Sequence, residues 1–167
     1  MKCALTLSAG AVFAWCAAAC AGPSDGVVIS AVPPSEGFPA VSRALSAHCG
    51  SLDCHGQVGR NLRVYGQFGL RLDPATRPDG EETTPLEFDT TYDSLIAIEP
   101  EILAAVYADG GRHPERLTMI RKERGTEHHK GNAVFRENDD GDRCLVSWVK
   151  GKIDVTACSA ASKIQRP

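Results

Sequence analysis

The cysteines restrict what this chain can fold into more than any other feature. The sequence has seven of them: two, Cys3 and Cys16, precede Cys20 within Met1–Ala21, and four follow it. That segment carries a single charge, Lys2, then an apolar run and a small-residue end, which is typical of a secretory signal peptide. A retained anchor helix is the alternative, although a bilayer-spanning helix needs about 20 predominantly apolar residues. We therefore expect export to an oxidising compartment, where cysteines pair or bind ligands.

The end of this segment predicts how the chain is processed. Ala17-Ala18-Ala19-Cys20 resembles the lipobox of bacterial lipoproteins, in which the cysteine is acylated after cleavage. The alternative is ordinary cleavage after Ala19 or Ala21. Lipidation of Cys20 leaves an even set of four cysteines, which favours this route. We expect a periplasmic or outer-surface lipoprotein that touches the membrane only through its lipid, with residues 22–37 as a flexible tether.

The part of the chain after the signal segment is long enough for one domain with its own core. The chain has 167 residues and a formal net charge of −3, which disfavours a nucleic-acid partner because phosphate binding needs a clustered basic surface. The sequence contains no G-x-S-x-G, no H-E-x-x-H and no phosphate-cradling glycine loop. An enzyme is therefore less expected than a carrier or a binding protein.

Apolar spacing, prolines and glycines predict a mainly α fold, a small single domain of short helices with long loops at residues 38–158. Residues 61–72 alternate as in a short strand or an irregular extended segment, residues 73–85 have loop composition, and residues 159–167 form a C-terminal tail. The expected helices are Phe38–His48 capped by Ser35, Tyr92–Ile98, Pro100–Ala108 before Gly110, one starting at Pro114, and Arg143–Lys150, started by Asp140 or Asp142 and ended by Gly151.

One segment, Cys49-Gly-Ser-Leu-Asp-Cys54-His55-Gly56, carries distinctive chemistry. Covalent haem attachment needs two thiols for the two vinyl groups of one porphyrin and a histidine, next to the second thiol, that ligates the iron. Four residues separate the thiols here, a wider spacing than the usual C-x-x-C-H. The segment favours one covalent haem c on Cys49 and Cys54, with His55 as an iron ligand.

Further motifs follow in a fixed order: Gly69-Leu-Arg-Leu-Asp73, Pro114-Glu-Arg-Leu117, His129-Lys-Gly131 and Leu145-Val-Ser-Trp148-Val-Lys-Gly151. Together with Cys54-His-Gly56 they resemble the c-type cytochrome-like domains of secreted proteins from planctomycetes and myxobacteria. The resemblance covers roughly residues 39–151. It implies a small helical fold around one haem, used for electron transfer with redox protein partners.

The second iron ligand has several candidates. His129 matches the H-x-G motif of the family, and His128 precedes it in the same glycine-bounded loop. Met119 lies in an expected helix, whereas a distal methionine usually comes from a loop, and His113 is a weaker candidate. Two histidine ligands give a lower reduction potential than histidine with methionine.

Each cysteine pair also has another interpretation. Cys49 and Cys54 could form a local disulfide in a haem-free envelope lipoprotein whose stapled helical domain serves binding or structure. His128 and His129 could bind zinc with those cysteines, although the tight C-x2-C spacing of structural zinc sites is lacking. We expect Cys144 and Cys158 to form a disulfide that ties the last helix to the tail.

Overall fold

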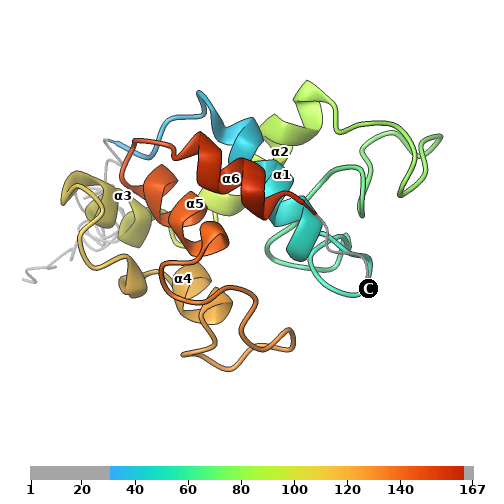
Figure 1. Cartoon of the computed structure of the whole chain (residues 1–167). Coiled ribbons are helices and arrows are strands. Elements are labelled where there is room, and N and C mark those ends of the chain that lie inside the picture. The colour runs from blue at the N-terminus through green and yellow to red at the C-terminus, as the bar shows by residue number, and fades with distance from the viewer. Residues whose placement is uncertain (1–30, 164–167) are drawn as a thin grey trace, which may run out of the picture.

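A computed structural model describes residues 31–163 of the chain. The signal segment, Cys20 and the first part of the expected tether lie outside the described residues. Within the described range the fold is mainly α, as the sequence predicts (Figure 1). The helices are α1 (Phe38–His48), α2 (Pro85–Ile96), α3 (Pro100–Ala108), a 3-10 turn at Pro114–Arg116, α4 (Thr118–Glu123), α5 (Asp140–Val149) and α6 (Val155–Ala161).

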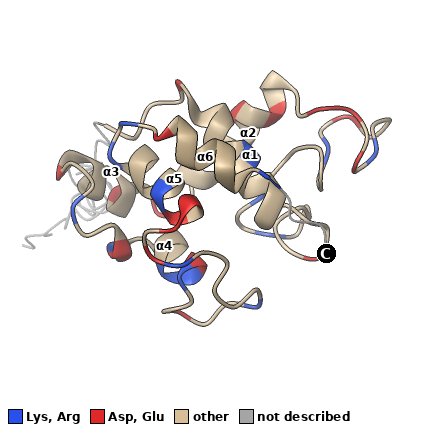
Figure 2. Ribbon diagram, in the orientation of Figure 1, with Lys and Arg blue, Asp and Glu red and all other residues tan. Residues whose placement is uncertain are grey.

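The core lies where α1, α5 and α6 pack together, with α2 against α1. Phe38 at the start of α1 meets Trp148 of α5 and Tyr92 of α2, with ring centroids 5.3 and 5.2 Å apart. Trp148 and Phe38 are fully buried. Charged side chains gather in the loops and at helix ends, and α6 carries none (Figure 2). No helix between residues 31 and 163 is long and apolar enough to cross a membrane.

Most helix limits follow from local signals. Pro100 starts α3, Gly110 follows its end at a φ of 69°, and Asp139 caps α5 by accepting a hydrogen bond from the backbone of Asp142 at 3.0 Å. Proline fits the first turn of a helix because its missing N–H has no partner there anyway. Gly151 ends α5 at a φ of 73°, which favours glycine.

Several expectations were wrong in detail. Gly37, not Ser35, is the N-cap of α1. Helix α2 begins at Pro85 rather than at Tyr92, because Thr84 and Glu87 form a reciprocal capping box. The expected helix from Pro114 is a 3-10 turn followed by α4, and residues 61–72 are irregular except for an isolated bridge between Tyr65 and Leu70.

The two ends of the domain also extend further than expected. The carbonyl of Pro33 accepts a hydrogen bond from Tyr92 Oη at 2.7 Å, and that of Pro34 accepts one from Trp148 Nε1 at 3.3 Å. The last residues of the expected tether are therefore fixed to the core. At the other end, α6 continues to Ala161, inside the segment expected as a tail, because Asp154 caps it and its buried face packs on α1 and α5.

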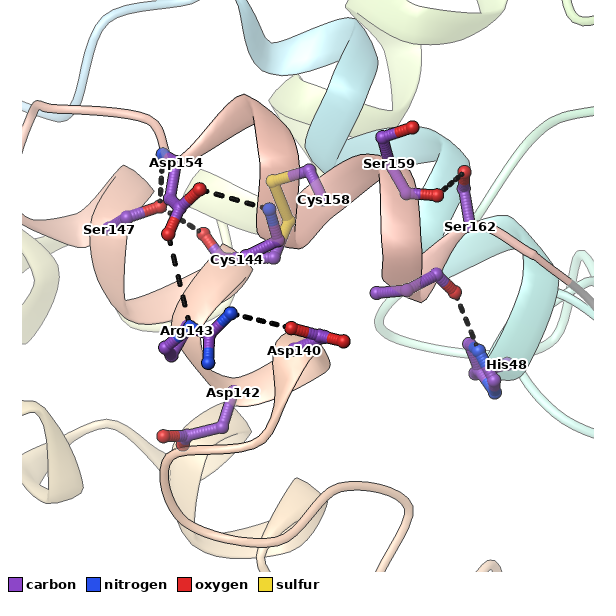
Figure 3. Close-up of a disulfide and its surroundings, with 12 residues drawn as sticks. His48, Asp140, Asp142, Arg143, Cys144, Ser147, Asp154, Cys158, Ser159 and Ser162 are labelled. Carbon is purple, nitrogen blue, oxygen red and sulfur yellow. Dashed lines mark hydrogen bonds and ion pairs between the residues drawn. A yellow bond between two sulfur atoms is a disulfide. The ribbon is translucent and has the colours of Figure 1, made fainter.

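The predicted disulfide between Cys144 and Cys158 is present and joins α5 to α6 (Figure 3). Both cysteines are fully buried. Beside them, Asp154 accepts a hydrogen bond from the Ala157 backbone at 2.9 Å, and its own backbone N–H donates to Ser147 Oγ at 2.8 Å. His48 Nε2 donates to the Ala161 carbonyl at 2.7 Å and so anchors the end of α6 on α1.

Removing this disulfide should lower the stability of the fold. Its ends are 14 residues apart in sequence, and closing a loop of that length constrains the unfolded chain by about 3 kcal/mol. We expect the Cys144→Ala/Cys158→Ala variant to lose about that free energy of unfolding in urea titrations. Reductant should destabilise the wild type and leave the variant unchanged. A loss below about 1 kcal/mol would contradict the structural role of the bridge.

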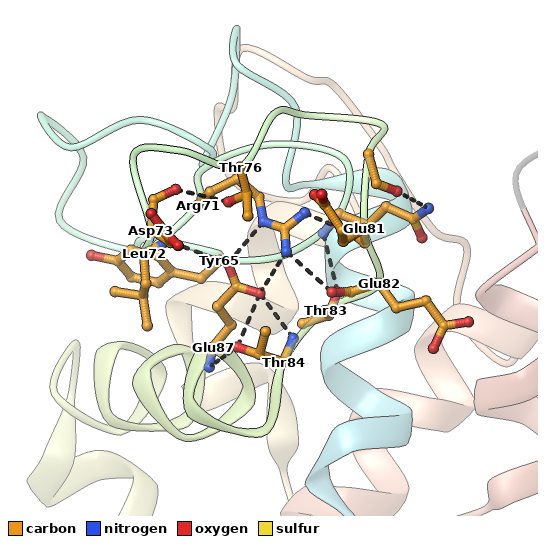
Figure 4. A network of polar contacts seen from close by, with 12 residues as sticks. Tyr65, Arg71, Leu72, Asp73, Thr76, Glu81, Glu82, Thr83, Thr84 and Glu87 are labelled. Carbon is orange, nitrogen blue, oxygen red and sulfur yellow. Dashed lines mark hydrogen bonds and ion pairs between the residues drawn. The ribbon is translucent and has the colours of Figure 1, made fainter.

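A buried ion pair holds the long loop before α2 (Figure 4). Arg71 Nε donates to Glu87 Oε1 at 2.8 Å, and both side chains are at most 3 % exposed. The same guanidinium donates to the carbonyls of Glu81 and Glu82, at 2.7 and 3.1 Å. Glu87 also accepts from the backbone amides of Leu72 and Thr84. The Arg71 segment is thereby fixed to the first turn of α2.

Candidate functional site

The main cavity of the candidate site opens between the end of α1, the loop after it, α4 and the loop before α5. Its volume is about 510 Å³, within the usual range for small-molecule and cofactor sites. Apolar side chains from elements far apart in the sequence form much of the wall: Leu45, Leu62, Leu95, Ile98, Met119, Val134 and Leu145. Cys49, His55, Glu123 and His129 are the wall residues with acid–base or ligand chemistry on which the site depends.

His55 is held with one ring nitrogen free. Its Nδ1 lies 3.1 Å from the carbonyl oxygen of Leu62. A carbonyl can only accept, so Nδ1 carries the proton and Nε2 keeps its lone pair. Burial lowers the pKa of His55, and the nearby His129, Arg60 and Lys122 lower it further against the effect of the Leu62 bond. A neutral imidazole whose other nitrogen donates to a backbone carbonyl is the usual arrangement of a metal-binding histidine.

His129 faces His55 from the loop between α4 and α5. The two ring centroids are 6.0 Å apart and the planes differ by 22°. Its Nδ1 lies 3.4 Å from the carbonyl oxygen of Asn132. As in His55, Nδ1 is therefore the nitrogen that donates to a backbone carbonyl, here over a longer distance, and Nε2 is left without a proton. The sequence places these two histidines far apart, and the fold brings them to the same cavity.

Cys49 and Cys54 are free thiols in the structure and are not bonded to each other. Cys49 ends α1 and lines the main cavity, whereas Cys54 lines a smaller cavity of about 230 Å³ that shares His55 and His129 with it. Burial raises the pKa of the Cys49 thiol to about 12, with smaller effects from Glu123 and Cys54. Both thiols thus lie beside the histidine pair, as attachment to one group requires.

Three glycines let the cysteine loop fold tightly. A Cβ added at Gly56 or at Gly69 would overlap the carbonyl oxygen of Gly50. The backbone N–H of His55 donates to the carbonyl of Cys49 at 2.8 Å, which closes the loop on itself. Gly56 and Gly69 are therefore needed for the close approach of these backbone stretches to Gly50. The loop folded in this way carries His55 into the cavity wall.

The remaining candidate ligands are placed differently. Met119 lies on α4 and lines the main cavity, half-buried. His128 is exposed and reaches only the smaller cavity. The side chain of His113 is 76 % exposed and bonds Glu115, and it lines neither cavity. Sequence reasoning missed Glu123, whose charged neighbours Arg121, Lys122 and Arg124 give no sign of its burial.

The donor set does not fit a bare metal ion. Between residues 31 and 163 no group of three or more His, Cys, Asp or Glu side chains is arranged to hold one. The zinc interpretation of His128 and His129 is not supported for this reason, since structural zinc takes four protein ligands. Two neighbouring imidazoles could instead serve a metal whose other ligands come with the cofactor, as the four porphyrin nitrogens do in haem.

Comparisons with known proteins add nothing to this picture: no protein-family model, curated protein or solved structure matches the chain.

Proposed function

We propose that this protein is a monohaem c-type cytochrome that carries single electrons between redox proteins. Cys49 and Cys54 would hold the porphyrin, and His55 and His129 would ligate its iron. The observation that carries the proposal is the pair of histidine rings, with centroids 6.0 Å apart, in the wall of a largely apolar cavity. When bound, haem supplies an iron that accepts and releases one electron.

The side chains around the cavity have defined tasks in this function. The carbonyl of Leu62 fixes the tautomer of His55, and the loop carbonyl of Asn132 does the same for His129. Such outer partners orient a ligand and raise its basicity. The apolar wall limits access of water, and solvent exposure is one determinant of a haem's reduction potential. The proposed role is the transfer of electrons between proteins rather than catalysis on a substrate.

The cations at the rim suggest the charge of a partner. Arg60, Lys122 and Lys130 line the smaller cavity beside the histidine pair, with Asp53 the one carboxylate among its lining residues. A cluster of one sign steers an oppositely charged partner and speeds its association. The redox partner in this proposal is therefore a protein with an acidic docking face.

Export belongs to the same proposal. Met1–Ala21 has the pattern of a signal peptide, and a lipid on Cys20 would hold the domain at a membrane surface, periplasmic or outer. Intact-mass measurement of protein extracted from the membrane fraction tests this part: we expect a chain that begins at Cys20 and carries the mass of its acyl groups. A chain without lipid that begins at Ala21 or later would contradict it.

Absorbance and intact mass test the haem itself. The full chain should be produced with its signal segment in a bacterium that matures c-type cytochromes. We expect a Soret band and a mass excess of one porphyrin that survives denaturation. Cys49→Ser/Cys54→Ser should lose the covalent mass, and the matched control Cys144→Ala/Cys158→Ala should keep it.

A colourless protein would overturn the proposal. If its mass were also lower by the hydrogens of two disulfides, Cys49 and Cys54 would be paired, and the haem-free lipoprotein with a stapled binding or structural domain would take its place.

A further inference from the structure

Glu123 is a buried acid with no partner. It lies at the end of α4, is 6 % exposed, and lines the main cavity. Neither of its carboxyl oxygens has a hydrogen-bond partner in the structure. Buried polar side chains are nearly always paired, so an unpaired carboxyl in the wall of a cavity points to a role toward what the cavity holds.

The charges around Glu123 do not neutralise it. Burial, and then the carboxylate of Asp142 on α5, raise its pKa to about 10, with a smaller opposing effect of Arg124. The Arg124 guanidinium is directed elsewhere, because Nε bonds Asp142 at 2.6 Å and Nη1 lies 3.4 Å from Glu137. The other charged or titratable groups that act on it or share its cavity are Asp139 at the N-cap of α5, Cys49 at the end of α1, and His55, Arg60, Glu99, Lys122 and His129 in the wall.

We infer that Glu123 couples electron transfer to proton transfer: its carboxylate takes up one proton from solvent when the haem iron beside it gains one electron. This inference rests on the proposed function. The electron would come from a one-electron donor protein, and the bound haem would supply the iron that accepts it. The proton forms an O–H bond on the Glu123 carboxyl, and both steps reverse on oxidation.

The reason is electrostatic. Ferric haem carries one more positive charge than ferrous haem, so it favours the ionised carboxylate more strongly. Charges inside a protein interact far more strongly than in water, and neither carboxyl oxygen of Glu123 has a hydrogen-bond partner in the structure. The affinity of Glu123 for its proton must therefore rise when the iron is reduced, and the reduction potential must depend on pH.

The midpoint potential of the haem-loaded protein, measured from pH 6 to pH 10, tests this coupling. Over the pH range where reduction takes up the proton, we expect the potential to fall with rising pH, by at most about 59 mV for each tenfold drop in proton concentration. Glu123→Gln cannot take up a proton and should flatten this dependence. Glu137→Gln is the matched control, because Glu137 is an exposed carboxyl that pairs with the nearby Arg124. This variant should keep the pH dependence of the wild type.

Two measurements on the wild-type protein test the inference even if Glu123→Gln does not fold: the pH dependence of the potential, and infrared difference spectra. In the wild type, infrared difference spectra between the reduced and oxidised states should show the band of a protonated carboxyl on reduction, shifted in heavy water. A haem-loaded protein whose potential is independent of pH, or that shows no such band, overturns this inference alone. A colourless protein overturns the proposed function, and the inference with it.

Stability gives a readout that needs no redox step. Between pH 4.5, the usual pKa, and about 10 the folded state holds a proton on Glu123 that the unfolded chain releases. The free energy of unfolding must then fall as pH rises through this window. Glu123→Gln should show a smaller fall than the wild type, and an identical fall in both proteins would contradict the buried protonated acid.

Discussion

Replacing Arg71 by alanine is expected to destabilise the protein by about 3–5 kcal/mol, because it leaves Glu87 as a buried charge without its partner. The guanidinium also satisfies the carbonyls of Glu81 and Glu82, so the whole loop before α2 loses its attachment. Urea unfolding followed by circular dichroism measures the change. Arg77→Ala, an exposed arginine in the same loop, is the control and should change stability by no more than about 0.5 kcal/mol.

The effect of Arg71→Ala should shrink in acid. Burial alone would raise the pKa of Glu87, but the hydrogen bonds from Arg71 and from the amides of Thr84 and Leu72 outweigh it and hold the pKa below its usual value of 4.5. The stabilisation by this carboxylate is present above pH 4.5 and is lost as pH falls through the folded pKa. In the variant the buried carboxyl prefers to be protonated, so the difference from wild type should be smaller at pH 4 than at pH 7. An equal difference at both values would show that the lost contacts, not the charge, matter.

If the protein binds haem as proposed, replacing His129 by alanine should change the haem spectrum more than any other histidine substitution except that of His55. The variant lacks the imidazole that faces His55 at 6.0 Å, so the iron should pass from a low-spin to a high-spin state. Absorbance and electron paramagnetic resonance record this change. Added imidazole should restore the low-spin spectrum, because it supplies the missing nitrogen ligand.

His128→Ala is the control for this experiment. His128 is exposed and adjacent in sequence, so the variant should keep the wild-type spectrum. Met119→Leu tests the other wall residue that could bind iron, and it too should leave the spectrum unchanged. A high-spin spectrum in Met119→Leu together with an unchanged His129→Ala would assign the ligand to the methionine and raise the expected potential.

The helices were predictable where a local signal stands beside an apolar pattern. Pro100 and Gly110 mark α3, and the aspartates and Gly151 mark α5. The start of α2 was missed although Thr84 and Glu87 have capping-box spacing, because the prolines and acids before them have loop composition. Helix α6 was missed because seven residues are too few for a periodic pattern, and its stability comes from the packing on α1 and α5.

The candidate site was predictable mainly in the part that is contiguous in sequence. Cys49, Cys54 and His55 are close in sequence, so spacing alone singles them out. His129 was identified through its motif, but its position opposite His55 results from the fold of the loop before α5. Burial of Glu123 could not be read from a stretch of charged residues, since it follows from which side of α4 faces the cavity.

The burial of Cys49 has a consequence for how the chain matures. In the proposed haem protein, Cys144 and Cys158 pair while Cys49 and Cys54 stay reduced until haem is attached, although export would expose all four cysteines to the same oxidising surroundings. With a pKa of about 12, Cys49 is a thiolate in only about one molecule in 10⁵ at pH 7. Because the thiolate is the species that attacks a disulfide, the folded domain slows exchange between Cys49 and the bridge of α5 and α6. In that proposal the fold itself would therefore help to keep Cys49 reduced until the porphyrin reaches it.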